Sequence, residues 1–189
     1  MRHLMAEDWI SVTLYPNGTM KNKLGIRDAA ELADLEFQIS AERELLLLKE
    51  KVKVGQIEDL KKIHKIMFSP LYEWAGHYRK GDFRKGNTVF FPRERFDYAE
   101  EDINEAISNL PKKGPLTAEN YASLIDKINF FHPFREGNGR STRTFLQLFA
   151  LEHEQAIDYP LTNEAMIVAE NEADVAKIAL LLKVKALAE

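Results

Sequence analysis

The stretch His132–Arg143 constrains this chain most, because one helix must end and another begin within a few residues. Before it, apolar side chains recur three and four positions apart, which is the spacing of one helix face. Pro133 stops that helix, since the residue before a proline avoids helical backbone angles. Glycines on both sides of Asn138 permit unusual dihedral angles. We therefore expect a helix that ends at His132, a tight loop, and a second helix over about 140–154.

The loop and the start of the second helix form a predicted anion site. Successive N–H groups in a glycine-rich turn, here Gly137–Gly139, can converge on one anion. The free N–H groups at the start of a helix add to the same site. Arg140 and Arg143 lie three apart and can project from one face of the first turn. Two cations at the positive end of a helix are unfavourable alone, so we expect a ligand with several negative charges.

Glu136 and His132 add the remaining chemistry of the stretch. A carboxylate beside an anion is unfavourable unless a divalent cation bridges the two. Magnesium typically takes one or two protein carboxylates together with substrate phosphates. His132, at a helix end, can face a cleft, and the unperturbed histidine pKa near ~6.5 suits proton transfer at neutral pH. The pattern predicts a magnesium–polyphosphate site with a histidine at its rim.

Each of these residues also has a plainer interpretation. A Gly-Asn-Gly sequence is commonly a simple turn. A lone histidine at a helix end is commonly a cap or a core group, and two arginines spaced by three are commonly a solvated helix face. These interpretations must all hold in one stretch, whereas a single phosphate site accounts for every residue in it.

The stretch His132–Arg140 resembles the signature of Fic-domain proteins. That signature runs His-Pro-Phe-any-Asp/Glu-Gly-Asn-Gly-Arg, usually with a second arginine three residues on, here Arg143, and every position matches. Leu71–Gly76 with Arg79 is similar to a second recurring block of the family. Tyr15–Ile26 resembles the N-terminal arm of bacterial Fic toxins and host-targeted Fic effectors. The likeness therefore covers most of the chain.

The resemblance implies transfer of AMP from ATP to a Tyr, Thr or Ser hydroxyl of another protein, with Mg²⁺ as cofactor and pyrophosphate as the leaving group. His132 would be the general base, Glu136 the magnesium ligand and Phe134 the core anchor of the loop. The nucleotide-binding residues would be Arg135, Gly137, Asn138, Gly139, Arg140 and Arg143. Backbone N–H groups would form the anion hole, with the Asn138 side chain on the α-phosphate. The two arginines that follow would grip the β- and γ-phosphates.

Residues 77–92 alternate short strands with glycine turns, which predicts a β-hairpin. By resemblance this hairpin is the flap over the active site, and it would hold the target by adding a strand to its edge. The docking residues would be Thr88, Val89, Phe90 and Phe91. The plainer interpretation is a structural hairpin that places an aromatic pair in the core. Basic side chains around it can steer an acidic target or keep an exposed edge from pairing (Lys80, Arg84, Lys85).

Apolar spacing predicts a mostly helical chain. The expected helices cover residues 28–51, 57–68, 96–110, 117–132, 140–154, 162–170 and about 175–182. Asp28, Thr117 and Thr162 are the expected N-caps of three of them. Leu45–Leu48 is apolar all round and predicts burial on several sides. The expected fold class is all-α, a helical bundle with one β-hairpin, which agrees with the Fic fold.

Composition narrows the class of protein. The 189 residues suffice for one domain, 1–189, with a substantial core, and the formal charge of −4 does not suggest a nucleic-acid binder. The absence of cysteine excludes disulfides, and the five histidines show no zinc spacing. No apolar run reaches the length of a membrane span, and no secretion signal is evident. Residues 1–26 predict an extended arm, and we expect a cytoplasmic protein.

Regulation is the next prediction. Many Fic proteins are held inactive by a helix with the pattern Ser/Thr-x-x-x-Glu-Gly/Asn, whose glutamate pairs with the second arginine of the motif. Ser40 and Glu44 have that spacing, but Leu45 follows them, and Ser69 with Glu73 fails in the same way. We therefore expect a separate small antitoxin to supply an inhibitory glutamate against the second arginine.

Several functions remain open at this point. The first is an AMP transferase, as the toxin half of a toxin–antitoxin pair, with a type II topoisomerase subunit as a target borrowed from the family. The second is another Fic-type transfer, of phosphate, UMP or phosphocholine, or the removal of AMP. Kinase-type relatives replace the second glycine with lysine, whereas Gly139 is intact here. The third is a nucleotide-binding interaction protein without transferase activity, which would have no use for His132.

Overall fold

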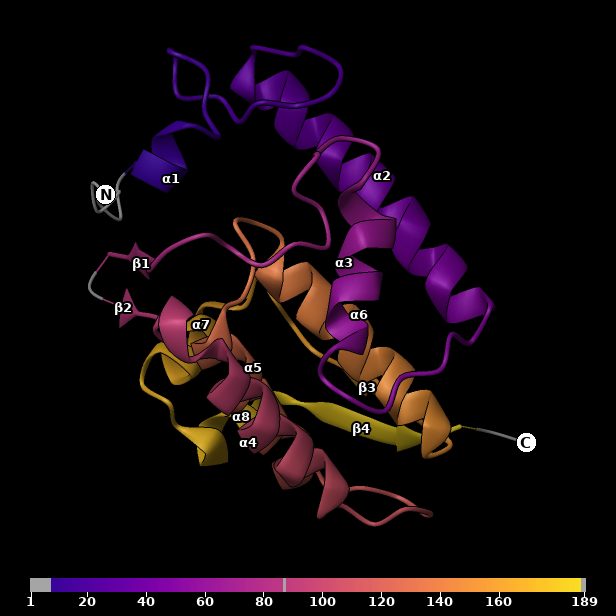
Figure 1. Ribbon diagram of the computed structural model, residues 1–189. Helices are drawn as coiled ribbons and strands as arrows, with labels where there is room; N and C mark the ends of the chain where they lie inside the picture. The colour runs from indigo at the N-terminus through magenta and orange to yellow at the C-terminus, as the bar shows by residue number, and fades with distance from the viewer. Residues whose placement is uncertain (1–7, 87, 188–189) are drawn as a thin grey trace.

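The structure is a computed structural model that describes residues 8–86 and 88–187. Figure 1 shows helices gathered around α5 and α6, with two small sheets at the periphery. The helices are α1 (Asp8–Ser11), α2 (Ala29–Lys49), α3 (Asp59–Phe68), the 3₁₀ turn η1 (Arg93–Arg95), α4 (Phe96–Ser108), α5 (Ala118–Phe131), α6 (Asn138–Glu152), α7 (Glu164–Asn171) and α8 (Val175–Leu181). The strands are β1 (Arg84–Lys85), β2 (Thr88–Val89), β3 (Gln155–Asp158) and β4 (Lys183–Ala186). The mostly helical fold confirms the predicted fold class.

Helix α5 is the centre of the core. It packs against α4, α6 and α8, while α6 packs against α3 and α2 on its other side. Tyr121 and Ile125 of α5 and Phe145 of α6 are fully buried. Burial of such side chains contributes about 1.5–3 kcal/mol each. The loop between α5 and α6 therefore starts and ends on the two best-anchored helices.

Two of the three predicted helix N-caps are present in the structure. Asp28 accepts hydrogen bonds from the first-turn N–H groups of α2, and Thr117 forms a capping box with Asn120 at the start of α5. The third prediction is wrong, because Asn163 and not Thr162 caps α7, accepting from the backbone N–H of Met166. Asparagine and threonine are both good caps, and the sequence does not decide between neighbours.

Helix α2 buries a different face from the one its leucines suggest. Within Leu45–Leu48 only Leu47 is fully buried, and Leu45 is 68% exposed, so the predicted burial of this run is wrong. The buried row instead includes Glu36, Ser40 and Glu44, which lie four apart on one face. These polar side chains face α6 and contact its arginines, which explains why the helix turns them inward.

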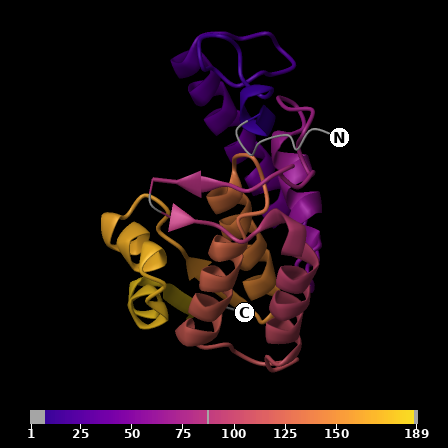
Figure 2. The ribbon, with the colours of Figure 1, turned by 60° about the vertical axis from the view of Figure 1, so that its left-hand side comes forward.

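The β-hairpin is shorter than the predicted segment 77–92. Its antiparallel register pairs Arg84 with Val89 and Lys85 with Thr88, and Asn87 of the predicted turn lies outside the described residues. In Figure 2 the hairpin crosses beside the loop that joins α5 to α6. The backbone N–H of Phe91 donates to the Phe130 carbonyl at 2.9 Å, which ties the end of the hairpin to α5.

A second sheet, β3–β4, was not predicted. It is antiparallel, with Gln155 opposite Ala186 and Asp158 opposite Lys183. Gln155 is buried, and its amide bonds the backbone of Leu116 in both directions. Strands of four residues show too little alternation of apolar and polar side chains to be predicted from sequence. The prediction of one β-hairpin therefore missed the second sheet.

The N-terminal arm packs on the body of the protein. Its predicted turn is present, since Leu14 and Met20 form an antiparallel bridge around Gly18, whose φ is +86°. The arm contacts the body where Lys23 N–H donates to the Leu71 carbonyl at 2.8 Å. Residues 1–7 of the predicted arm lie outside the described residues. Across the described ranges, no helix is both long and apolar enough to cross a membrane.

Candidate active site

Two left-handed residues shape the loop between α5 and α6. His132 caps the C-terminus of α5 with a φ of 42°, and Gly137 caps the N-terminus of α6 with a φ of 79°. A Cβ atom on Gly137 would lie 2.6 Å from Cζ of Phe68, so no other residue fits there. A left-handed conformation at a non-glycine residue such as His132 is uncommon and costs free energy. Tertiary contacts therefore hold the His132 backbone in a conformation that is unfavourable for a non-glycine residue.

The Asn138 side chain holds the loop closed with two hydrogen bonds to the backbone of Phe134. Its side-chain oxygen accepts from the Phe134 N–H at 2.8 Å, and its amide donates to the Phe134 carbonyl at 3.0 Å. Phe134 itself is fully buried. The Asn138 side chain is therefore committed to the loop, whereas the resemblance implied a contact with the α-phosphate. What this residue offers a ligand is its backbone N–H at the start of α6.

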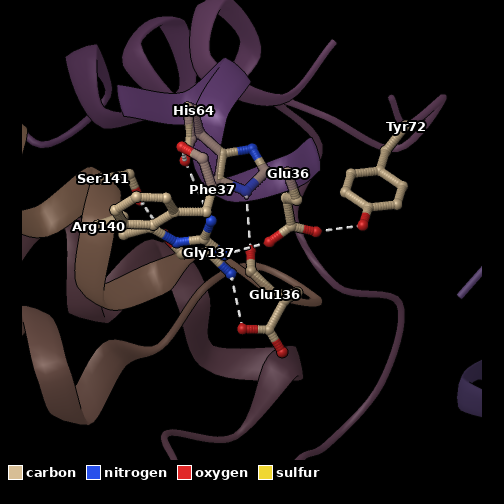
Figure 3. Close-up of polar contacts among 9 residues, drawn as sticks. Glu36, Phe37, His64, Tyr72, Glu136, Gly137, Arg140 and Ser141 are labelled. Atoms are coloured by element: carbon tan, nitrogen blue, oxygen red, sulfur yellow. Dashed lines mark hydrogen bonds and ion pairs between the residues drawn. The ribbon is translucent and has the colours of Figure 1, made fainter. Parts of the chain in front are cut away.

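His64 supports the loop from the neighbouring helix α3. Its Nε2 donates to the Glu136 carbonyl at 2.9 Å, as Figure 3 shows, and its Nδ1 accepts from the Gly76 N–H at 2.8 Å. The ring stacks on Phe134 with 3.8 Å between centroids. His64 is fully buried, so it is a packing residue that also supports the loop. Burial, together with the charge of Arg140, lowers the pKa of His64 to about 4.

Acidification is expected to destabilise the fold through His64. The pKa is about 4 in the folded protein and near 6.5 when unfolded, so the unfolded chain binds the proton first. Between pH 6.5 and pH 4, stability should fall by about 1.4 kcal/mol per pH unit from this group. Urea unfolding across that range should give a shallower pH dependence for His64→Gln. The exposed His77→Gln serves as control, and equal slopes for all three proteins would contradict this.

His132 is covered by the hairpin. Phe90 of the hairpin stacks on the His132 ring with 3.7 Å between centroids, and Phe83 lies at 5.8 Å. Burial, together with the charge of Arg79, lowers the pKa of His132 to about 3. The ring is therefore neutral at physiological pH, and a neutral imidazole can accept a proton.

Arg79 joins the loop to the hairpin. It is 2% exposed, and its Nε donates to the His132 carbonyl at 3.0 Å. Its other guanidinium nitrogens donate to the carbonyls of Gly81 and Phe91, and its backbone N–H donates to the Pro133 carbonyl at 2.8 Å. Burial lowers the Arg79 pKa to about 10, which leaves the side chain charged at neutral pH. The sequence placed Arg79 in a recurring block without a role.

The arginines at the start of α6 are each paired with a glutamate of α2. Arg140 bonds Glu36, and Figure 3 shows Glu36 also accepting from the Tyr72 hydroxyl. Arg143 makes a two-point contact with Glu44, at 2.7 Å from Nη2 and 3.2 Å from Nε. No sequence pattern marks Glu36, and Glu44 does not match the inhibitory pattern because Leu45 follows it. Both arginines thus have carboxylate partners within the chain.

Glu136 has the properties of a single magnesium ligand. Its side chain is exposed beside the start of α6, and one of its oxygens accepts from the Gly137 N–H at 3.1 Å. Within the described ranges, no group of three or more acidic, histidine or cysteine side chains is placed to hold a metal. Magnesium often takes one carboxylate, substrate phosphates and water, so this site fits an ion that arrives with a nucleotide.

Arg135 lies apart from the other predicted nucleotide-binding residues. Its Nε donates to the Thr13 hydroxyl at 2.9 Å, and its guanidinium carbon lies 6.0 Å from the centre of the Trp9 ring. It lines a cleft against the N-terminal arm, and the residues lining that cleft do not include Arg140 or Arg143. The structure therefore places His132, Glu136, Arg140 and Arg143 at one loop and helix start. The Arg135 side chain instead points into the cleft against the N-terminal arm.

The predicted docking residues of the hairpin divide between two faces. Phe90 is buried against His132, whereas Val89 is 64% exposed. Thr88 lies at the hairpin tip, with its hydroxyl 3.4 Å from the Asn171 side chain of α7. The exposed part of the hairpin at Val89 is therefore the part that another chain can reach.

A family model described as the Fic/DOC family matches residues 55–150 of the chain, which include the whole loop and both arginines. The chain belongs to this family. Among solved structures, the Fic/DOC chain is similar to the BepC effector of Bartonella tribocorum with bound AMPPNP. The TM-score is 0.80 at 22% identity, over 95% of this chain and 96% of that one. At this identity the similarity concerns the fold.

Curated relatives of this Fic/DOC protein carry one activity in their names. The protein adenylyltransferase VbhT of Bartonella schoenbuchensis is 32% identical over 147 residues, which are 75% of this chain and 31% of VbhT. The probable protein adenylyltransferase Fic of Salmonella typhimurium is 29% identical over 154 residues, 77% of this chain and 75% of that protein. The chain thus spans about a third of VbhT and three quarters of the Salmonella protein.

Proposed function

We propose that this protein is a protein adenylyltransferase, which moves AMP from ATP to a Tyr, Thr or Ser hydroxyl of a target protein and releases pyrophosphate. The observation that carries the proposal is a neutral, half-buried His132 in the same loop that presents the start of α6 with Arg140 and Arg143. The names of the curated relatives support AMP as the transferred group.

In the proposed reaction His132 takes the proton from the target hydroxyl as the oxygen attacks the α-phosphorus. The bond from the α-phosphorus to the bridging oxygen breaks, and pyrophosphate leaves in line. The free N–H groups at the start of α6 stabilise negative charge on the α-phosphate, and Arg140 and Arg143 hold the β- and γ-phosphates. Catalysis then rests mainly on positioning and charge.

Glu136 is the residue that would hold a magnesium ion. Bound there, the ion would supply neutralising charge to the phosphates. The hairpin edge beside Val89 would hold the modified segment of the target by strand addition. Since Phe90 of the same hairpin stacks on His132, a segment paired with this edge would run beside the base.

We further propose that the protein is a toxin controlled by a small antitoxin. A cavity of ≈ 420 Å³ beside Arg143 is lined by Leu45 and Leu48 of α2 and by Tyr159. Exposed Phe37 and Leu45 extend this apolar surface along α2, where an antitoxin helix could pack. Type II topoisomerase subunits remain the proposed class of target. We place the activity in the cytoplasm, with which a chain that lacks cysteine is compatible.

Glu44 occupies the fork of Arg143 that a γ-phosphate would use. Replacing Glu44 by alanine is therefore expected to lower the KM for ATP by about threefold to tenfold, the worth of one partly exposed ion pair. Steady-state kinetics at varied ATP measures this, with the exposed Glu42→Ala of the same helix as control.

Two outcomes would oppose this view of Glu44. A fall in kcat at unchanged KM would mean that Glu44 aligns Arg143 rather than competing with phosphate. An isolated chain that is inactive until Glu44→Ala releases it would contradict the need for a separate antitoxin, because inhibition would then lie within this chain.

The function itself is tested by the chemistry of the product. The purified protein is incubated with ATP, magnesium and cell lysate, and modified peptides are analysed by mass spectrometry. The proposal predicts an AMP group on a Tyr, Thr or Ser side chain, formed by the wild type and not by His132→Ala. Peptides that carry phosphate, UMP or phosphocholine instead would contradict AMP transfer.

A further inference from the structure

A second cleft, of ≈ 980 Å³, lies between the N-terminal arm and the segment that leads into the hairpin. In Figure 1 the arm with α1 lies at the top of the molecule, and the chain between α3 and β1 runs below it. Arg135 of the loop between α5 and α6 and Arg79, which bonds that loop, form part of its wall, whereas His132, Arg140 and Arg143 do not line it. It is thus a separate cavity that adjoins the active site.

The cleft concentrates positive charge in a protein that is negative overall. Seven of the described residues that line it are lysine or arginine, and Glu73 is the single acidic one among them, whereas the whole chain has a formal charge of −4. The basic composition of the cleft is therefore not a reflection of a basic protein. Like charges gathered in one place repel each other unless an anion joins them.

Besides the buried Arg79, four of these cations have no carboxylate partner within the described ranges: Lys21, Lys80, Arg93 and Arg135. Lys21 donates to the Val12 carbonyl, and Arg93 donates to the Arg79 carbonyl. These neutral acceptors hold the side chains in place but leave their charge available. Two indole rings, Trp9 and Trp74, supply apolar surface between the cations.

The cleft continues into the hairpin. Trp9 donates from its indole N–H to the Asp82 carbonyl at 3.2 Å, and its ring packs edge-on to Phe83. The Arg93 N–H donates to the Asp82 side chain at 2.7 Å. Lys80 lies two residues before Asp82. A chain paired with the edge of the hairpin would therefore reach the cleft within a few residues.

We propose that this cleft binds an acidic segment of the target protein, adjacent to the segment that the hairpin holds. The proposal rests on the proposed function in taking a protein as the substrate. The cations stand on five separate parts of the chain, the arm, α3, the segment 73–80, η1 and the catalytic loop, as expected for an extended ligand. The aromatic walls suit apolar side chains between the acidic ones.

The test measures peptide binding without ATP, so it does not depend on catalysis. The probe is a fluorescein-labelled peptide of glutamates around one tyrosine, followed by anisotropy, with the glutamine version as reference. Lys21→Glu/Lys80→Glu should weaken binding of the glutamate peptide at least about fivefold, since each reversal turns an attraction into a repulsion. Lys112→Glu/Lys113→Glu, which makes the same charge change on an exposed loop, should leave binding unchanged.

Equal binding by the two double variants, or no binding by the wild type, would overturn the proposal. The proposal would also be overturned if inorganic triphosphate displaced the glutamate peptide from the wild type and lost its own binding in Lys21→Glu/Lys80→Glu. The cleft would then be a site for a small polyanion. Binding that is lost only in Lys21→Glu/Lys80→Glu supports the cleft even in a preparation without AMP transfer, so the two proposals fail separately. With an active preparation, the same variant should raise the KM for the target and not that for ATP.

Discussion

Replacing His132 by alanine is expected to lower the rate of AMP transfer by about a hundredfold to ten-thousandfold, the usual contribution of a positioned general base. The ring is neutral at physiological pH because burial and the charge of Arg79 lower its pKa to about 3. ATP affinity should change little, since Arg140, Arg143 and the start of α6 remain. Transfer rates and nucleotide titrations on the same preparation measure both.

Because the His132 ring stacks on Phe90, His132→Ala could also disturb the hairpin, so a second variant is needed to isolate the loss of the base. His132→Gln keeps a side chain of comparable reach but cannot act as a base, so it should be as inactive as His132→Ala. Transfer by either variant at more than about a tenth of the wild-type rate would exclude His132 as the base. Parallel loss of ATP affinity would mean that the ring supports the fold of the site and not the proton transfer.

Replacing Arg79 by methionine is expected to have the second large effect, on stability and on rate together. The substitution leaves the carbonyls of His132, Gly81 and Phe91 without their buried donor. Each unpaired buried group costs about 1–3 kcal/mol, so the free energy of unfolding should fall by at least about 3 kcal/mol. The rate should fall about tenfold to a hundredfold, because His132 and the flap lose their common anchor.

Urea unfolding and steady-state kinetics separate these two effects. The exposed Arg95→Met on η1 is the matched control and should change stability by less than about 0.5 kcal/mol. Arg79→Lys keeps the charge but loses the planar fork that reaches three carbonyls, so it should be intermediate. An Arg79→Met protein with wild-type stability would contradict the role of this residue as the link between loop and hairpin.

The helices and the loop were predictable because their signals are local. Pro133 and the glycines beside Asn138 fix where α5 ends and α6 begins, and the structure moves the start of α6 by only two residues, to Asn138. The difference arises because Gly137, at a φ of 79°, completes the turn before the asparagine. Backbone constraints of this kind act within a few residues and can be read from sequence.

The carboxylates that pair with Arg140 and Arg143 could not be predicted, because their position depends on which face of α2 packs against α6. Glu36 and Glu44 approach the arginines from about a hundred residues away in sequence. The apolar run Leu45–Leu48 favoured a different buried face. A row of polar residues four apart, at 36, 40 and 44, was the available signal, and its meaning depends on α6 lying opposite.

The decisive question is whether His132 acts as the general base for transfer of AMP, which carries the α-phosphate of ATP, to a target hydroxyl. The most direct test incubates the protein, magnesium and lysate with ATP labelled at either the α- or the γ-phosphate, beside His132→Ala and Arg143→Ala. We expect protein labelled only from the α-position, with the label lost in His132→Ala and reduced in Arg143→Ala. Protein labelled from the γ-position would contradict it, because the nucleotide would then bind in the opposite orientation and transfer phosphate.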